Sequence, residues 1–174
     1  MRALYYFLIG LLLFYIDVAI SLVIPMHIGH TSIIFVPHLT LMYLVMICIY
    51  RGLNVALILS IVLGIITDVT IGTIYGIYLF GYLLLVVLFD QLFKVFYRDK
   101  SMLFILVLLS TLGFEIFSAI IYGVLGLIDF NIVSFLFFRI IPTLILNLIL
   151  LIILFPILHK FFKKIQRKID NLHG

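Results

Sequence analysis

The chain has 174 residues, of which 67% are apolar and 10% charged, whereas a soluble domain of this size carries roughly 45–50% apolar and about 25% charged residues. This composition excludes a water-soluble domain, because the folded chain would expose far more apolar surface than soluble monomers tolerate. The formal charge of +4 does not indicate a nucleic-acid partner, since the basic residues lie between apolar runs and are not interleaved with aromatic residues on one soluble face.

Six apolar runs follow one another along the chain. They cover residues 4–24, 33–50, 53–70, 74–93, 102–125 and about 139–158. Each is close to the ~20 residues with which a helix crosses the hydrocarbon core, and none alternates as the strands of a membrane β-barrel do. No small-residue cleavage site follows the first run, so we expect a retained helix. The sequence predicts an all-α integral membrane protein with a single domain, residues 1–174, of six transmembrane helices.

A tight turn must interrupt the nearly unbroken apolar stretch 53–93, since one helix of that length would extend ~60 Å, about twice the hydrocarbon thickness. Turn-forming residues occur only around 71–73. Gly64, Asp68, Gly72 and Gly76, each four residues apart, therefore straddle a helical hairpin in which Asp68 ends one helix and Gly76 begins the next. Gly64 and Asp68 share a helical face, where a small residue allows close approach of another backbone.

The basic residues predict the orientation of these helices. With six spans, the two termini and two of the loops lie on the same side of the membrane. These segments contain all of the 11 lysine and arginine residues except Arg139. The positive-inside rule therefore places the N and C termini in the cytoplasm.

A basic tail, residues 159–174, follows the last run. Its basic residues are Lys160, Lys163, Lys164, Arg167 and Lys168, and its apolar face is formed by Phe161, Phe162, Ile165 and Ile169. We expect this amphipathic tail to lie on the inner membrane surface and to contact anionic lipids. The alternative is that its charges only keep the C-terminus inside.

Three acidic residues, Asp17, Asp68 and Glu115, lie within the apolar runs. Counted from the inner ends of their helices, each is about 20 Å deep, in the outer half of the bilayer, and Arg139 has a comparable depth. Burying a charge in lipid is costly, so we predict that Arg139 lies near at least one acid. A role in holding helices together is favoured over proton or ion relay, for which Glu115 is the best candidate.

Metal binding and catalysis have little support in the sequence. His27, His30 and His38 lack a recognised ligand spacing, and the single cysteine, Cys48, excludes an intramolecular disulfide and a Cys-based zinc site. No nucleophile motif or protease motif occurs. We expect no cofactor, no metal and no enzymatic activity.

The run "GIITDVTIGTIYGIYLFGYLL" resembles the signature of the MreD family of bacterial rod-shape-determining membrane proteins, G-x3-D-x3-G-x3-G. The segments "FVPHLTL" and "RIIPTLILNLIL" are also similar to the family's pattern, at Pro37, Arg139, Pro142 and Asn147. The family often has a carboxylate or amide after this first proline, where the chain has His38.

The resemblance implies a multi-pass protein of the bacterial cell membrane that acts as a non-catalytic component of the machinery for cell-wall elongation. It implies association with MreC and, through MreC, with the penicillin-binding transpeptidase, RodA and MreB. It further implies a fold similar to that of the S components of ECF-type vitamin transporters.

A second interpretation is that of a membrane module that binds a small molecule for import, as an S component does. Asp17, Asp68, Glu115 and Arg139 could line a polar cavity open to the outside. The short outer loops count against this interpretation, since such binders use loops to close over the ligand.

Overall fold

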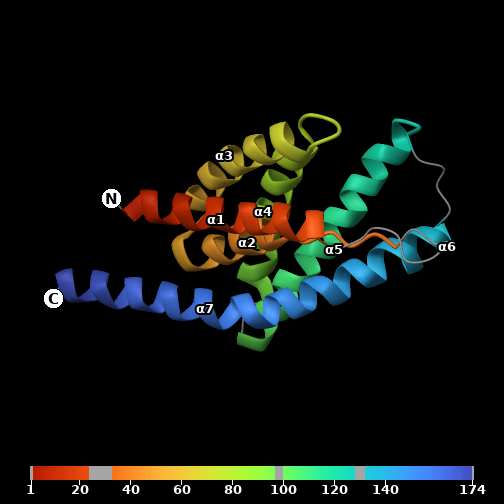
Figure 1. Cartoon of the computed structure of the whole chain (residues 1–174). Coiled ribbons are helices and arrows are strands. Elements are labelled where there is room, and N and C mark those ends of the chain that lie inside the picture. The colour runs from red at the N-terminus through yellow and green to blue at the C-terminus, as the bar shows by residue number, and fades with distance from the viewer. Residues whose placement is uncertain (1, 24–32, 97–99, 128–131, 174) are drawn as a thin grey trace.

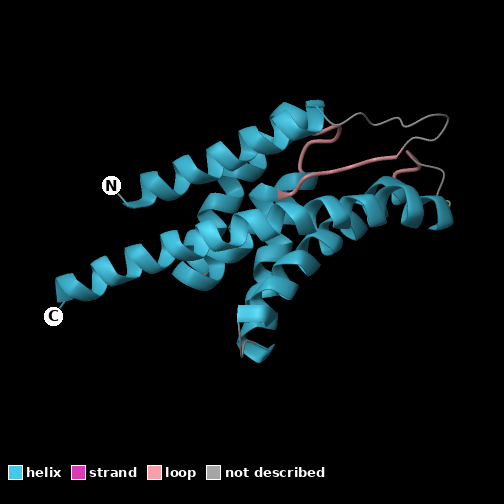
Figure 2. Cartoon of the chain, turned by 60° about the horizontal axis from the view of Figure 1, so that its bottom comes forward, coloured by secondary structure: helices cyan, strands magenta, loops and turns pink. Residues whose placement is uncertain are grey.

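In the computed structural model, the described residues are 2–23, 33–96, 100–127 and 132–173, and all the regular structure within them is helical (Figures 1 and 2). The elements are α1 (Arg2–Val23), α2 (Leu39–Arg51), α3 (Leu53–Ile71), α4 (Ile77–Phe96), α5 (Lys100–Val124), α6 (Ile132–Phe135), the π-helix η1 (Leu136–Ile140) and α7 (Ile141–His173). Both termini lie at one end of the molecule, and α6 lies at the opposite end (Figure 1).

Five helical segments of the described chain are long and apolar enough to cross a membrane. They are Leu4–Val23, Leu53–Ile71, Ile77–Val95, Ser101–Val124 and Val133–Lys164. The prediction of an all-α membrane protein is confirmed at this level. The helix α2 is also apolar but has 13 residues, or about 20 Å of helix, which is less than the ~30 Å hydrocarbon core.

The second predicted run, 33–50, is helical only from Leu39, so the expectation of one helix along this run was wrong for its first third. Residues 33–38 have no regular secondary structure. Pro37 explains the late start, because its ring disfavours helical backbone in the preceding residue and removes a backbone donor.

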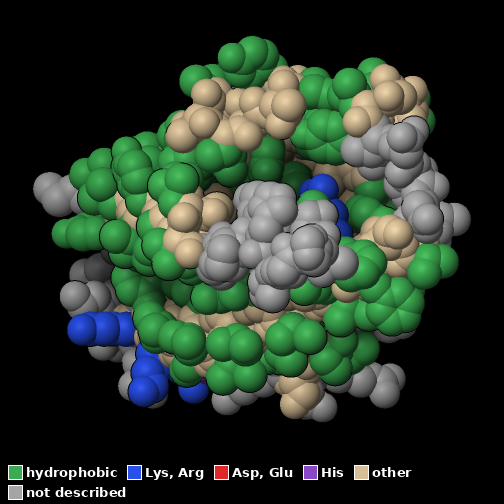
Figure 3. Space-filling view, turned by 45° about the vertical axis from the view of Figure 1, so that its right-hand side comes forward, with side chains coloured by type: hydrophobic (Ala, Val, Ile, Leu, Met, Phe, Trp, Pro, Cys, Tyr) green, Lys and Arg blue, Asp and Glu red, His purple; other side chains and the backbone are tan. Residues whose placement is uncertain are grey.

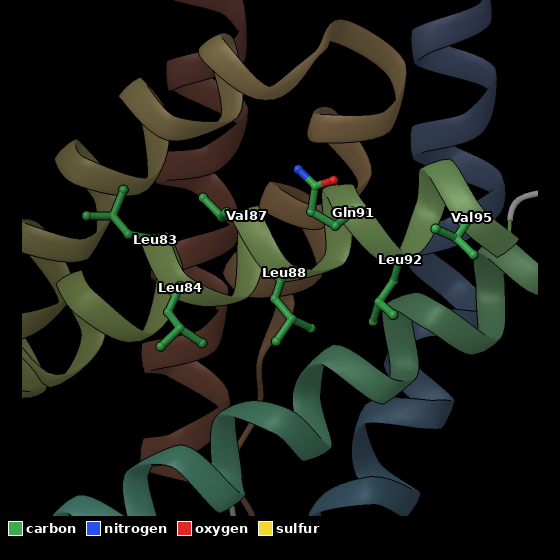
Figure 4. Close-up of a pocket in the computed structure, with 7 residues that line it drawn as sticks. All are labelled: Leu83, Leu84, Val87, Leu88, Gln91, Leu92 and Val95. Carbon is green, nitrogen blue, oxygen red and sulfur yellow. The ribbon is translucent and has the colours of Figure 1, made fainter.

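The short helix α2 forms the centre of the bundle. It contacts α1, α3, α4, α5 and α7, and every residue from Leu39 to Cys48 is buried. The face shown in Figure 3 is dominated by hydrophobic side chains, with lysine and arginine visible near its lower left edge and inside a central hollow. One shallow groove on this surface follows α4 (Figure 4), and it is lined by Leu83, Leu84, Val87, Leu88, Gln91, Leu92 and Val95.

The last helix differs from the predicted span 139–158 with a separate tail 159–174. The chain is helical from Ile132, and α7 continues without interruption to His173. Phe162 is 1% exposed and packs on Tyr50, Tyr43 and Tyr6, with ring centroids 4.9, 6.3 and 6.5 Å away. The expected contact of the tail's apolar face with the membrane surface is therefore wrong at Phe162, because the aromatic residues of α1 and α2 cover that side chain. The side chains of residues 165–173 lie outside the described part.

Candidate functional site

An ion pair joins Glu115 of α5 to Arg139 of η1, with Arg139 Nε donating to Glu115 Oε2 over 2.7 Å. The other carboxylate oxygen lies 2.9 Å from Nε2 of His38, the residue that precedes α2. The side chains of Glu115 and His38 are each 2% exposed, whereas that of Arg139 is 28% exposed. The predicted proximity of Arg139 to an intramembrane acid is thus confirmed, and Glu115 is that acid.

Asp17 of α1 binds the N-terminus of α2. Its carboxylate accepts hydrogen bonds from the backbone N–H groups of Leu39 and Thr40, both at 2.8 Å, and from the Thr40 hydroxyl at 2.7 Å. The first N–H groups of a helix have no partner within the helix, and the N-terminal end of the helix dipole favours a negative charge. Asp17 therefore caps α2 from a neighbouring helix.

Asp68 of α3 binds the N-terminus of α4 in the same way. Its two carboxylate oxygens accept from the backbone N–H groups of Tyr78 and Leu79, each at 2.9 Å. The turn that makes this possible covers residues 72–76, slightly beyond the predicted 71–73, and ends at Gly76, whose φ of +100° is costly for any residue with a Cβ. Asp68 is thus held by the helix that follows it.

Close packing of α3 on α4 depends on Gly64, as the sequence predicted. A Cβ at Gly64 would lie 2.8 Å from the Cα of Leu79, a distance that the backbone of α4 does not permit without movement. Gly72 ends α3, and its N–H donates to the carbonyls of Thr67 and Asp68. Three of the four-spaced residues therefore shape the hairpin, and Asp68 ties its two helices together.

The irregular segment 33–38 obtains its hydrogen bonds from η1 and α7. The Ile34 N–H donates to the Phe138 carbonyl over 2.8 Å, where the π-helix interrupts the regular helical ladder. Asn147 accepts from the His38 N–H at 2.8 Å and donates to the Val36 carbonyl at 2.7 Å. Backbone outside a helix is tolerated at membrane depth only when it is buried in protein or lines a water-filled cavity. Asn147 thus supports the non-helical segment that precedes α2.

Thr143 completes this support, although the sequence did not single it out. Its hydroxyl accepts from the Val36 N–H at 3.3 Å and donates to the Ile34 carbonyl at 3.4 Å. The signal that could have identified it is its spacing, since Arg139, Thr143 and Asn147 are four residues apart and so share one helical face. His38 was predicted as a candidate metal ligand and as the residue at a family position that often carries a carboxylate or amide. That polar position after Pro37 was the signal for its contact with Glu115.

The predicted polar residues do not all converge on one site. Glu115, Arg139, His38 and Asn147 form one connected network, and Asp17 joins it through the start of α2. Asp68 instead makes its bonds within the α3–α4 hairpin. Pro142 lies inside the continuous helical stretch 132–173 and has no N–H to donate to the Phe138 carbonyl four residues earlier, and that carbonyl accepts from the Ile34 N–H.

Metal ligation has no support from the part of the chain that the structure describes, in which no group of three histidine, cysteine, aspartate or glutamate side chains could hold an ion. His27 and His30 lie outside the described residues. All three acids are engaged by the protein itself. Asp17 and Asp68 accept from N–H groups at helix starts, and Glu115 joins α5 to η1 and to His38.

Comparison with known proteins identifies the family. The family model described as rod shape-determining protein MreD matches residues 1–165. The rod shape-determining protein MreD of Bacillus subtilis (strain 168) is 24% identical over 136 residues, which cover 76% of this chain and 77% of that protein. No solved structure gives a significant match. With its apolar helices in the cell membrane and a family role in determining rod shape, the chain belongs to the rod shape-determining protein MreD family.

Proposed function

We propose that this chain is a non-catalytic assembly component of the bacterial cell-wall elongation machinery, in which it binds and stabilises MreC. The observation that carries the proposal is the family match across residues 1–165. The bonding of the three intramembrane acids supports it, because each acid is engaged in joining helices and none is presented to a substrate. The penicillin-binding transpeptidase, RodA and MreB are reached through MreC.

The chain crosses the membrane six times in this proposal, with both termini in the cytoplasm. The second crossing combines the non-helical segment 33–38 with α2. Six residues can add up to roughly 20 Å to about 20 Å of helix, enough to exceed the ~30 Å hydrocarbon core. An even number of crossings agrees with the two termini lying at the same end of the molecule (Figure 1). The positive charges Lys160, Lys163 and Lys164 lie in the C-terminal part of α7, which reaches that end.

The α3–α4 hairpin is the surface that we assign to MreC, and Arg139 and Glu115 stabilise the bundle behind it. The tip of the hairpin carries large exposed apolar side chains at Val69, Tyr75 and Phe80, which are 68%, 78% and 65% exposed. In lipid, helix association depends on packing and interhelical hydrogen bonds, so a rigid and close-packed hairpin is a suitable contact. Gly64, Asp68, Gly72 and Gly76 make this hairpin rigid.

Depletion and pull-down test the proposal. Depleting the protein should give rounded cells and loss of the MreC that co-purifies with the wall-synthesis proteins. Replacing Phe80 by alanine should reduce the MreC recovered, whereas the same change at Ile58, which is 64% exposed on α3 away from the turn, should not. Unchanged cell shape and an intact MreC complex after depletion would contradict the proposal.

A second candidate function is small-molecule binding in an S-component-like fold. It is favoured by Arg139, which remains 28% exposed while the rest of its network is buried, and by a basic side chain visible inside a hollow of the face shown in Figure 3. Mass spectrometry of the purified protein tests it: a stoichiometric small molecule that is lost in Arg139→Gln supports this function, and its absence refutes it.

A further inference from the structure

One face of α7 is exposed along its whole described length and changes from apolar to basic within one turn. The apolar part consists of Ile149, Ile152, Ile153 and Ile157, which are 53%, 58%, 59% and 60% exposed. The basic part consists of Lys160, Lys163 and Lys164, which are also exposed. At about 100° per residue, these seven side chains fall within one stripe less than half the circumference wide. We call this stripe the α7 outer face.

The opposite face of α7 is fixed against the bundle. Leu151, Leu154, Leu158 and Phe162 are 0%, 7%, 3% and 1% exposed. The ring of Phe162 stacks on Tyr50 and Tyr43, so the helix cannot roll about its axis at the level of the lysines without breaking these contacts. The three lysines are therefore held on the same side as the isoleucines.

The position of the lysines matches that of lipid phosphates. Ile157 to Lys160 is a rise of about 4.5 Å, so the ammonium groups begin directly where the apolar surface ends. A lysine in this place extends its apolar stem along the helix and its charge toward the headgroups. Within the described part of the chain, no ion pair engages these three ammonium groups, whereas Lys94 on α4 is held by Asp90 at 2.6 Å.

We propose that the α7 outer face is a binding site for an anionic phospholipid. Its acyl chains lie along the four isoleucines, and its phosphate accepts hydrogen bonds from Lys160, Lys163 and Lys164. A lipid is favoured over an acidic soluble protein because the lysines continue a face that is itself turned to hydrocarbon. The proposal rests on the membrane location of the helices and not on any protein partner.

Lipid retention by the purified protein tests this site. The protein is reconstituted into vesicles of equimolar phosphatidylglycerol and phosphatidylcholine with identical chains, extracted in mild detergent, and its bound lipids are counted by native mass spectrometry. Phosphatidylglycerol should be retained in excess, since each engaged lysine contributes about fivefold. The triple variant K160Q/K163Q/K164Q should lose this excess, and K160R/K163R/K164R should keep it. All variants should unfold at the temperature of the wild type, because the changed side chains are exposed.

Two controls show whether the lipid binds at the α7 outer face and whether its acyl chains are needed. K94Q removes an exposed charge beside the apolar groove of α4. Because Asp90 already binds this charge, K94Q should leave the excess of retained phosphatidylglycerol unchanged. Free glycerol 3-phosphate should not displace the lipid, because it lacks acyl chains. Retention of phosphatidylglycerol by the triple glutamine variant, or its displacement by glycerol 3-phosphate, would overturn the proposal.

Discussion

Replacing Glu115 by glutamine should destabilise the bundle more than any single change on its lipid-facing surface. The carboxylate is 2% exposed and contacts Arg139 at 2.7 Å and His38 at 2.9 Å, so its loss leaves a guanidinium without its counter-charge. Removing one partner of a buried ion pair costs about 3–5 kcal/mol. Because Arg139 is 28% exposed and so partly solvated, we expect Glu115→Gln to cost about 3 kcal/mol, at the lower end of this range.

A double-mutant cycle isolates the pair itself. Arg139→Gln alone should cost about as much as Glu115→Gln, and the double variant should cost less than the sum by about 1–2 kcal/mol, the upper range of measured couplings within membranes. The assay is reversible unfolding in mixed detergent micelles, followed by circular dichroism. The matched control is Asp90 with Lys94, whose lysine is 62% exposed and whose coupling should be at most about 1 kcal/mol.

The same cycle can refute the reasoning. Additive costs within about 0.5 kcal/mol would mean that the ion pair does not stabilise the protein. Charge reversal at Arg139 should be rescued by reversal at Glu115 but not at Asp17 or Asp68, because these two carboxylates bind backbone N–H groups and not the guanidinium. Equal rescue by either aspartate would contradict the structure.

Three further changes test the α3–α4 hairpin and the segment 33–38. Asp68→Ala should cost about 2–3 kcal/mol in the same unfolding assay, because two N–H groups of α4 lose their acceptor, whereas Thr70→Ala on the exposed side of α3 should cost under about 0.5 kcal/mol. Gly64→Ala should cost about 1–3 kcal/mol, since its Cβ would meet backbone at 2.8 Å, and Gly113→Ala should cost less because the nearest atom is the mobile end of a leucine. Asn147→Leu should speed hydrogen exchange of the 33–38 amides while leaving α4 protected; unchanged exchange would show that Asn147 does not hold this segment.

The hairpin and the ion pair show what the sequence was able to predict. The turn between α3 and α4 was predicted because a single helix of 41 apolar residues would be longer than the thickness of any bilayer, and because glycines occur near Gly72. The pairing of Arg139 followed from the cost of an isolated charge in lipid. Neither argument could choose among the three acids, because sequence gives the depth of a residue but not its direction around the helix axis relative to neighbours.

The predicted second span, residues 33–50, shows what the sequence could not predict. The hydropathy of an apolar run is the same whether the run forms one helix or a non-helical segment followed by a short helix. Hydropathy therefore does not reveal the backbone N–H groups that lose their helical partners in the non-helical segment. Some of those donors bind side chains more than 100 positions away along the chain, as the His38 N–H binds Asn147. The tail gives a second example, since the amphipathic pattern around Phe162 fitted a membrane surface as well as it fitted the tyrosines of α1 and α2.

The late start of α2 explains the presence of Asp17 in an otherwise apolar helix. Starting α2 inside the protein leaves N–H groups that no lipid can satisfy, and Asp17 supplies their acceptor. Glu115, held by His38 and Arg139, then links α5 and η1 to the same point. Asp17, Asp68 and Glu115 therefore each join parts of the bundle, which accounts for an acid in each of these apolar helices. The hairpin that Asp68 fixes also carries large exposed apolar side chains near its turn, at Val69, Tyr75 and Phe80.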